Sequence, residues 1–290
     1  MKILITGAGG MVARALIKHC SERGDEVFAH ARDTLDITEA TNVREVFERE
    51  RPDAVINCAA WTDVDGCELN PERAVLINAE AVEILATHSR LIVASFVTIS
   101  TDYVFAGDRE GFYTQRDDPD PQSAYGIAKL QGERRAQRVS ARTVVVRTGW
   151  IFGAGGRNFL ATVVERARRG EHLKAISDAY GTPTYAPHLA ARLRELAERD
   201  LPGTFHVVNG GAGTSFLEFA EEAARAAGVE GAEIEAVEMD SLTRPAPRPR
   251  NSRLRCLLSE AIGLAPLPHW RAALREFAQA GEREKGKGER

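Results

Sequence analysis

Along the first half of the chain, short runs of apolar residues alternate with longer stretches in which apolar positions recur every three or four residues. The short runs have the length of buried strands and cover Lys2–Thr6, Glu26–His30, Ala54–Ala59, Leu91–Ile99 and Thr143–Arg147. The longer stretches have the helical period and cover Met11–Arg23, Asn42–Arg51, Pro71–His88 and Ser123–Val139. This alternation predicts an α/β fold: a Rossmann-like, doubly wound parallel sheet between two layers of helices.

The rhythm loosens from about Gly149 onward. Helices are predicted at Arg157–Arg169, Ala186–Arg199 and Ser215–Ala227, and strands at Leu173–Ser177, Phe205–Val208 and Ile234–Val237. The segment Thr243–Arg253 holds three prolines and four arginines, which predicts an extended loop. We therefore expect residues 1–148 to form the sheet domain, with some later segments returning to it. Residues 149–280 should form a smaller α/β portion, and residues 281–290, which are charged and rich in glycine, a flexible tail.

Composition narrows the class of protein. The chain has 290 residues, of which 43% are hydrophobic and 28% charged, so it can build a sizeable core and is not intrinsically disordered. A net charge of −4 argues against binding to nucleic acid or to anionic membranes. No apolar stretch is long enough for a membrane span, and the first ten residues do not resemble a secretory signal. The four cysteines are widely spaced, as expected for free thiols in a cytoplasmic protein.

A glycine-rich turn follows the first predicted strand. Gly7, Gly10 and Ala13 have the spacing that lets backbone amides at a helix N-terminus approach a pyrophosphate. Such a turn is a weak signal when alone, because any tight strand-to-helix connection can use glycines. Its position after the first strand makes binding of a dinucleotide the favoured interpretation.

The end of the second predicted strand bears on the choice of cofactor. An acidic residue there binds the ribose 2′-hydroxyl of NAD, whereas an arginine accommodates the 2′-phosphate of NADP. This chain has His30 and Arg32 at that place, followed by Asp33. The sequence therefore favours NADPH, with NADH possible; the alternative is that Arg32 is an exposed charge without a ligand.

Tyr125 and Lys129 lie four residues apart in a predicted helix, so both side chains share one face. A nearby ammonium would stabilise a tyrosine phenolate and lower the tyrosine pKa, which suits proton transfer at neutral pH. The preceding strand ends in Ser100 and Thr101, at the sheet edge where doubly wound folds bind ligands. Thr101 could hydrogen-bond a substrate carbonyl, or could merely cap a local turn.

These motifs together resemble the extended short-chain dehydrogenase/reductase family. Further stretches narrow the resemblance to its dTDP-4-dehydrorhamnose reductases, namely Asn57–Glu68, Ser100–Gly107, Arg147–Phe152, Gly181–Thr184 and Arg248–Leu254. The likeness extends from Met1 to about Phe277. Two positions depart from the family pattern: Ala13 stands for the third glycine, and His30 for an acidic residue found in some relatives.

The resemblance implies a role for each matching residue. The implied catalytic residues are Thr101, Tyr125 and Lys129. The implied or proposed cofactor-binding residues are Gly7, Gly10, Met11, Val12, His30, Arg32, Asp36, Ile37, Ala60, Trp61, Thr62, Tyr125 and Lys129. The implied or proposed substrate-binding residues are Thr101, Asp102, Tyr103, Trp150, Arg248, Arg250 and Arg253. The arginines are chosen because forked donors suit a diphosphate, although an exposed, solvated loop would contain them equally well.

The implied reaction is NADPH-dependent reduction of the C4 keto group of dTDP-4-dehydro-L-rhamnose, the last step toward a sugar donor for cell-surface polysaccharide. Dehydration is disfavoured because Tyr103 stands where dehydratases carry a second carboxylate. Three alternatives stay open: reduction of another nucleotide-linked 4-keto-6-deoxy sugar, epimerisation, and a non-catalytic regulatory subunit. A homodimer is compatible with the resemblance, and no cluster of metal ligands is visible in the sequence.

Overall fold

The computed structural model describes residues 1–156, 159–229 and 231–288, with side chains up to residue 280. Its centre is a six-stranded, wholly parallel sheet in the order β10-β5-β4-β3-β1-β2. The strands are β1 (Lys2–Thr6), β2 (Glu26–His30), β3 (Ala54–Asn57), β4 (Ser95–Thr101), β5 (Thr143–Thr148) and β10 (Gly203–His206). The doubly wound parallel sheet expected from the sequence is confirmed.

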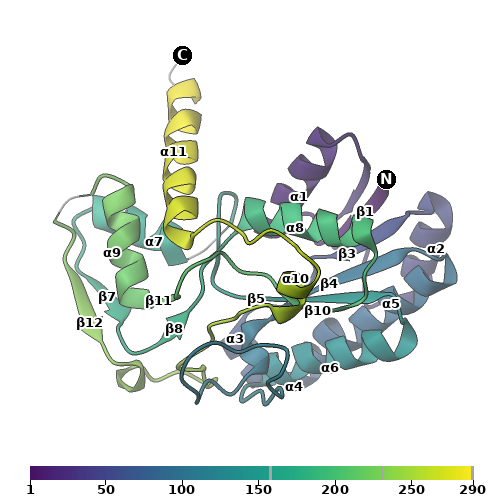
Figure 1. Ribbon diagram of the computed structural model, residues 1–290, viewed down its shortest axis with the longest axis horizontal. Helices are drawn as coiled ribbons and strands as arrows, with labels where there is room; N and C mark the ends of the chain where they lie inside the picture. Colours follow the sequence, from purple (N-terminus) through teal and green to yellow (C-terminus); the bar gives the residue numbers. More distant parts are fainter. Residues whose placement is uncertain (157–158, 230, 289–290) are drawn as a thin grey trace.

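Helices cover both faces of the sheet (Figure 1). One face carries α1 (Met11–Glu22) and α8 (Ala186–Arg199), which pack against each other. The other face carries α2 (Ala40–Glu50), α3 (Val64–Leu69), α4 (Pro71–Val75), α5 (Ala81–Leu91) and α6 (Ala124–Val139). Each face buries its own hydrophobic cluster, with Ile3, Leu16 and Leu193 in the first and Leu4, Phe47 and Leu85 in the second. Adjacent residues of β1 therefore point to opposite layers, as the period of a strand requires.

The strand order reverses between β1 and β3, because β2 lies on one side of β1 and β3 with all later strands on the other. Open parallel sheets bind ligands at such a reversal, beyond the carboxyl ends of the strands. The connections that leave β1, β3, β4 and β5 all begin at that edge. The topology alone thus predicts where a ligand site should lie.

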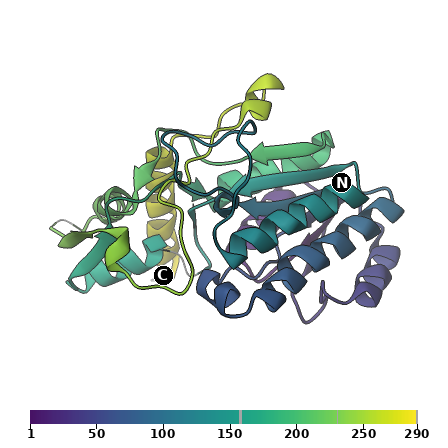
Figure 2. The ribbon, with the colours of Figure 1, turned by 90° about the horizontal axis from the view of Figure 1, so that it is seen from below.

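The second half of the chain contributes to both parts of the molecule. Its α8, β10 and α10 (Leu257–Ala261) belong to the sheet domain, where α10 packs beside β10, and most of the remainder forms a smaller body beside the carboxyl edge of the strands (Figure 2). That body consists of η3 (Met239–Ser241), the helices α7 (Phe159–Arg168), α9 (Phe216–Ala226) and α11 (Trp270–Gly288), and three strand pairs. The pairs are β6 (Ile151–Phe152) with β9 (Thr184–Tyr185), β7 (Leu173–Ile176) with β12 (Ile234–Val237), and β8 (Tyr180–Gly181) with β11 (Thr214–Ser215). Its core is aromatic, and Trp270 there is fully buried.

Several elements differ from the sequence expectations. The strand expected from Leu91 begins at Ser95, because α5 continues to Leu91 and Val93 adopts a left-handed conformation (φ 62°) that turns the chain. Helices α3, α10 and α11 were not predicted. The chain continues as α11 to Gly288, where a tail from residue 281 was expected; residues 289–290 lie outside the described part. Within the described part, no helix has both the length and the apolar character needed to cross a bilayer.

The helix predicted at Pro71–His88 is interrupted by a π-helical turn, η1 (Leu76–Glu80). The wider turn carries Asn78, a buried polar residue that no apolar pattern reveals. π-turns of this kind are frequent at functional sites. Here the turn faces the segment that leaves β3.

Candidate active site

Two adjoining cavities lie at the carboxyl edge of the sheet. The first cavity has a volume of about 380 Å³ and extends toward the end of β2, and the second has a volume of about 570 Å³ and extends toward the ends of β4 and β5. They share the lining residues Gly9, Gly10, Cys58, Ala59 and Ala60. Together they form one elongated site centred on the reversal of strand order, as expected for an extended ligand.

The glycine turn after β1 shapes the boundary between the two cavities. Gly7 has φ +69°, and a Cβ there would lie 2.8 Å from the backbone nitrogen of Ala59. Gly10 is the N-cap of α1; it provides no side-chain cap, and the first turn of the helix contains no acidic residue. The N-terminal amides of α1 are therefore available to an anion, and the helix dipole favours negative charge at this end.

The first cavity is lined by most of the residues predicted to bind the cofactor, namely Gly7, Gly10, Arg32, Asp36, Ile37, Ala60 and Trp61. The carboxylate of Asp36 accepts hydrogen bonds from the backbone and hydroxyl of Thr38, at 3.0 and 2.7 Å, and these bonds hold its pKa below the usual range. The uncapped amides of α1 and the guanidinium of Arg32 fit the phosphates of a nicotinamide dinucleotide. Thus the residues present fit NADPH.

His30 does not line either cavity, contrary to the expectation from the sequence. Its Nε2 lies 3.0 Å from Oε2 of Glu50 on α2, and its Nδ1 lies 3.3 Å from the Thr34 hydroxyl. The imidazole therefore points toward α2, where the Glu50 carboxylate lies beside its Nε2. His30 is thus engaged with neighbouring side chains of the protein.

Two polar networks beneath the cavities could not be predicted from the sequence pattern. Thr6 donates to Asn57 (2.6 Å), and Asn57 donates to Thr98 (3.1 Å), so side chains of β1, β3 and β4 are joined across the sheet. Asn78 accepts from the backbone N–H of Trp61 and donates to its carbonyl, both at 2.9 Å. These bonds fix the segment after β3, which lines both cavities. A polar residue within an apolar strand or helix is the only sequence signal for them.

The second cavity brings together the predicted catalytic residues and several predicted cofactor and substrate residues. Those that line it are Gly10, Met11, Val12, Ala60, Thr62, Thr101, Asp102, Tyr103, Tyr125, Lys129 and Trp150. They come from α1, from the segment after β3, and from β4, η2 (Asp102–Val104), α6 and the end of β5. The tertiary fold therefore assembles what the sequence spreads over 140 residues.

Tyr125 is buried at the first turn of α6, which Ser123 caps by accepting a hydrogen bond from Gly126 at 3.2 Å. Burial raises the pKa of the Tyr125 phenol well above its ordinary value, and a hydrogen bond with the Thr101 hydroxyl partly opposes that rise. The expectation from the sequence was that the Lys129 ammonium lowers this pKa; the largest effect is instead burial, which raises it.

The Lys129 ammonium donates a 2.6 Å hydrogen bond to the carbonyl of Ile99. Burial lowers its pKa to about 8, and the carboxylate of Glu133, one turn further along α6, acts in the opposite direction. Glu133 is itself buried, accepting a 2.5 Å hydrogen bond from Ser100 and pairing with Arg147 at 2.7 Å. A buried ion pair thus lies behind the lysine.

Asp102 is buried at the floor of the second cavity. Its Oδ1 accepts a 2.9 Å hydrogen bond from the Thr101 hydroxyl, and its Oδ2 makes no well-formed hydrogen bond to any described residue. A Cβ at Gly149 would lie 2.3 Å from Oδ2, so a glycine is required beside this carboxylate. Burial raises the pKa of Asp102 to about 6, although the Ser252 and Thr101 hydroxyls oppose the rise.

Trp150 connects the sheet to the smaller body. Its backbone has φ 49°, a left-handed conformation that costs energy for a bulky residue. The indole stacks on Phe216 with ring centres 3.7 Å apart and lies so close to Gly181 that any Cβ there would overlap it. The aromatic surface predicted to contact substrate is therefore held on the cavity wall by both neighbours.

The three predicted substrate arginines do not line either cavity. Arg248 forms a two-pronged ion pair with Asp65 of α3, at 2.6 and 2.8 Å, and Arg250 is paired with Asp178 and Asp240. Arg253 donates to Asn251 (2.8 Å). Arg248 also interacts with Tyr103, a residue of the second cavity.

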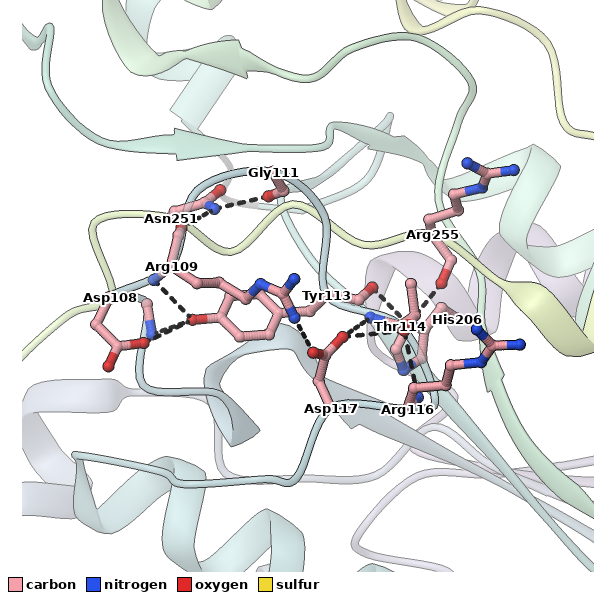
Figure 3. A network of polar contacts seen from close by, with 11 residues as sticks. Asp108, Arg109, Gly111, Tyr113, Thr114, Arg116, Asp117, His206, Asn251 and Arg255 are labelled. Atoms are coloured by element: carbon pink, nitrogen blue, oxygen red, sulfur yellow. Dashed lines mark hydrogen bonds and ion pairs between the residues drawn. The ribbon is translucent and has the colours of Figure 1, made fainter.

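The chain that carries these arginines is held in place by the loop after η2 (Figure 3). Asn251 donates to the carbonyls of Arg109 and Gly111, both at 2.7 Å, and its N–H bonds to Gly107. The loop is closed on itself by an ion pair between Arg109 and Asp117, and by a hydrogen bond from the Gly107 amide to the Tyr113 hydroxyl. The extended segment predicted at Thr243–Arg253 is thus ordered by side-chain and backbone bonds.

Fold and cavity together define an oxidoreductase of the extended short-chain dehydrogenase/reductase class. Within this class, the chain belongs to the family described as "RmlD substrate binding domain", whose model matches residues 1–283. The family resemblance seen in the sequence is thereby confirmed.

Curated and solved relatives agree with this membership. The chain is 39% identical over 279 residues to a dTDP-4-dehydrorhamnose reductase of Streptomyces griseus, covering 94% of this chain and 91% of that protein. A solved dTDP-4-dehydrorhamnose reductase of Clostridium acetobutylicum superposes with a TM-score of 0.93 at 35% identity, covering 97% of this chain and 100% of that one. One of Bacillus anthracis, solved in complex with NADP, superposes with a TM-score of 0.92 at 32% identity, covering 95% and 98%.

Proposed function

We propose that the protein catalyses the NADPH-dependent reduction of the C4 keto group of dTDP-4-dehydro-L-rhamnose, which gives dTDP-L-rhamnose. The observation that carries the proposal is the meeting of Thr101, Tyr125 and Lys129 in one buried cavity that adjoins the glycine turn. The names of the relatives support the same reaction. NADPH, when bound, supplies the hydride; the residues of the chain supply the proton and the positioning.

Tyr125 donates the proton to the alkoxide that forms at C4. Its raised pKa keeps the phenol protonated at neutral pH, which is the state required of a general acid in a reduction. The Thr101 hydroxyl interacts with Tyr125 and with Asp102, so it can orient the phenol toward a carbonyl oxygen. Because the Lys129 pKa is about 8, most of its ammonium stays charged at pH 7 and favours negative charge nearby.

The first cavity holds the adenosine half of the cofactor in this proposal. The amides at the start of α1 bind the pyrophosphate, and Asp36 and Ile37 flank the adenine. Tyr125 and Lys129, which line the second cavity, would bind the nicotinamide ribose.

The substrate occupies the remainder of the second cavity. Asp102, Tyr103 and Trp150 contact the sugar nucleotide there, with the indole presenting a flat face. Arg248, which interacts with Tyr103, is the arginine best placed for the diphosphate. Arg250 and Arg253 are each engaged with neighbouring side chains.

The decisive experiment follows NADPH oxidation when dTDP-4-keto-L-rhamnose is generated in place by the preceding pathway enzymes. We expect stoichiometric consumption of NADPH and formation of dTDP-L-rhamnose, identified by NMR. Tight NADPH binding without consumption would refute the proposal, in favour of another keto sugar or a regulatory subunit. Interconversion of sugars without net oxidation of NADPH would instead indicate an epimerase.

The proposal also places the enzyme in the cytoplasm as a homodimer. The four cysteines are free, as in proteins of reducing compartments, which supports the location. Leu76 and Ile127 are exposed on η1 and α6, which pack side by side, and supply apolar surface for a second copy. Fractionation and light scattering test the two statements separately.

A further inference from the structure

Arg73 lines the first cavity, although no motif of the sequence indicates it. It belongs to α4, about forty positions after Arg32 in the sequence, and its side chain is exposed. The guanidinium carbon lies 4.6 Å from the ring centre of Trp61, which itself lines the cavity. Since Asn78 clamps the backbone of Trp61 on both sides, the indole provides a fixed platform for this cation.

The charges around the first cavity leave Arg73 without an acidic partner. The cavity is lined by two guanidiniums, of Arg32 and Arg73, and by a single carboxylate, that of Asp36. Asp36 is engaged by Thr38 and lies 3.6 Å from Arg32. Among the residues that the structure describes, Arg73 forms no ion pair; its guanidinium lies over the Trp61 ring, and its backbone N–H donates to the side chain of Asn70 at 3.1 Å. This part of the site therefore carries a net positive charge suited to an anion.

We propose that Arg73, together with Arg32, binds the 2′-phosphate of NADPH and so selects this cofactor over NADH. The inference rests on the proposed use of NADPH. The pyrophosphate has its own site at the uncapped start of α1, so the remaining anionic group of the cofactor is the 2′-phosphate. Arg32 follows β2 and Arg73 lies on α4, so the two cations approach the first cavity from different elements. A planar guanidinium that already stacks on an indole loses little freedom when it binds a phosphate.

The proposal separates the two anions of the cofactor, which makes it testable with pairs of ligands. NADPH differs from NADH, and adenosine 2′,5′-bisphosphate from 5′-AMP, only by the 2′-phosphate. If Arg73 contacts that group, its removal weakens binding of the first member of each pair and spares the second. If Arg73 contacts the pyrophosphate or only supports Trp61, both dinucleotides are weakened equally.

The experiment is isothermal titration calorimetry of the four ligands with the wild type, Arg73→Met, Arg32→Met and Arg73→Lys. We expect Arg73→Met to weaken NADPH and the bisphosphate on the order of tenfold, with NADH and 5′-AMP changed less than twofold. Arg73→Lys should keep part of the preference, since it keeps the charge but loses the fork. Added salt should reduce the preference of the wild type more than that of Arg73→Met.

Arg90→Met is the matched control. Arg90 is an exposed arginine in the last turn of α5, which ends before β4 begins and therefore lies at the opposite edge of the sheet. It should leave all four affinities unchanged. An equal loss for both members of each pair in Arg73→Met, or no loss at all, would overturn the proposal. Because binding is measured without sugar substrate, an inactive protein that still prefers the 2′-phosphate would contradict the proposed reaction and not this inference.

Discussion

The surroundings of Tyr125 keep its phenol protonated, with the proton that it would donate in the proposed reaction. The phenol is nine-tenths buried, and burial together with the nearby Asp102 carboxylate disfavours the phenolate. In a reduction this is an advantage, since the group must arrive protonated and lose its proton only when an alkoxide forms. If Tyr125 instead acted as a base in an oxidation, its pKa would have to be lowered.

Replacing Tyr125 by phenylalanine removes only the hydroxyl. We expect kcat for keto-sugar reduction to fall on the order of 10²–10⁴-fold, with NADPH affinity nearly unchanged. Stopped-flow oxidation of NADPH, with cofactor binding measured separately, checks both statements. Tyr180→Phe is the control, because Tyr180 is an exposed tyrosine outside both cavities. Unaltered turnover in Tyr125→Phe would show that another group is the acid.

Asp102 should make stability depend on pH in an unusual direction. Its pKa is raised from 3.8 to about 6, so between these values the folded protein binds a proton that the unfolded chain has lost. Stability contributed by this group therefore falls as pH rises from about 4 to 6. The cost above pH 6 is about 2–3 kcal/mol for a shift of this size. Asp102→Asn should thus be more stable than the wild type at pH 8 and nearly equal at pH 4.

Urea unfolding of Asp102→Asn at several pH values measures this difference. Asp25→Asn provides a control of opposite sign, because Arg194 and the N-terminal amine hold the pKa of Asp25 below its usual range. That variant should be destabilised at neutral pH, and the difference should shrink as the wild-type carboxylate becomes protonated. Parallel curves for Asp102→Asn and the wild type would show that this carboxyl titrates normally.

At the residue scale the sequence predicted which residues share a cavity better than it predicted their contacts. Tyr125, Lys129 and Thr101 were identified because their types and spacing suit proton transfer, and the structure brings them together. The pairings of His30 with Glu50 and of Arg248 with Asp65 could not be anticipated, since each joins segments that only the tertiary fold places side by side. Arg73 was missed for the same reason.

The helix α6 is the element on which the site depends most. It carries Tyr125, Lys129 and Glu133 on one face, and two glycines let it approach its neighbours closely. A Cβ at Gly126 would lie 2.3 Å from the carbonyl of Tyr103, and one at Gly132 would lie 2.2 Å from that of Asn78. The position of the face that carries these three residues is therefore set by backbone contacts.

The ion pair of Glu133 with Arg147 joins α6 to β5. The loss of unfolding free energy on replacing one partner should depend strongly on whether the other is present. Arg147→Met leaves a buried carboxylate without its partner, and we expect a loss of about 3–5 kcal/mol of unfolding free energy. The double variant Glu133→Gln, Arg147→Met should lose clearly less than the two single variants combined. Denaturant unfolding of the four proteins forms a double-mutant cycle that measures this coupling.

A second double-mutant cycle, on an exposed ion pair, gives a reference value for the coupling energy of the buried pair. Arg169 and Glu165 are spaced as i,i+4 partners on and beyond α7, each with 63% of the side chain exposed. Pairs of this kind contribute only about 0.2–0.5 kcal/mol. Additive losses in the buried cycle would mean that Glu133 and Arg147 stabilise the protein independently.

Elements with a clear period were predicted from the sequence, whereas those set by tertiary contacts were not. The strands of the sheet and α1, α6 and α8 were found within a few residues because their apolar patterns are regular. The π-turn η1 was hidden inside a helical pattern. Segments such as α3 are too short to show a period, and their helical form depends on local caps such as Asp63, which accepts from Gly66 at 3.0 Å.

On the scale of the whole molecule, several ion pairs join the two halves of the chain, among them the pair of Asp65 with Arg248. Asp65 of α3 holds the Arg248 guanidinium and also accepts a 3.1 Å hydrogen bond from the amide of Ala246. The proline-rich segment of the C-terminal half is thereby attached to the half that carries the glycine turn. Residues 251–255 are anchored separately, by backbone bonds to Gly107 and Tyr113.

Asp65→Asn should release the first attachment and leave the second. We expect amide hydrogen exchange in residues 244–250 to accelerate on the order of tenfold, because a charge-assisted anchor is lost. Residues 251–255 serve as the internal control and should exchange as before. Mass spectrometry of peptides from the two stretches gives the comparison. Equal acceleration in both would indicate that the segment opens as one unit.

The stacked position of Trp150 on the cavity wall has a spectroscopic consequence. The chain has three tryptophans: Trp61 lines the first cavity, Trp150 the second, and Trp270 is sealed in the aromatic core. Occupancy of either cavity should therefore quench the emission of one indole and spare the other two. The molecule thus contains one indole at each cavity and a third as an internal reference, so filling of the two cavities can be followed by the light that the unlabelled protein emits.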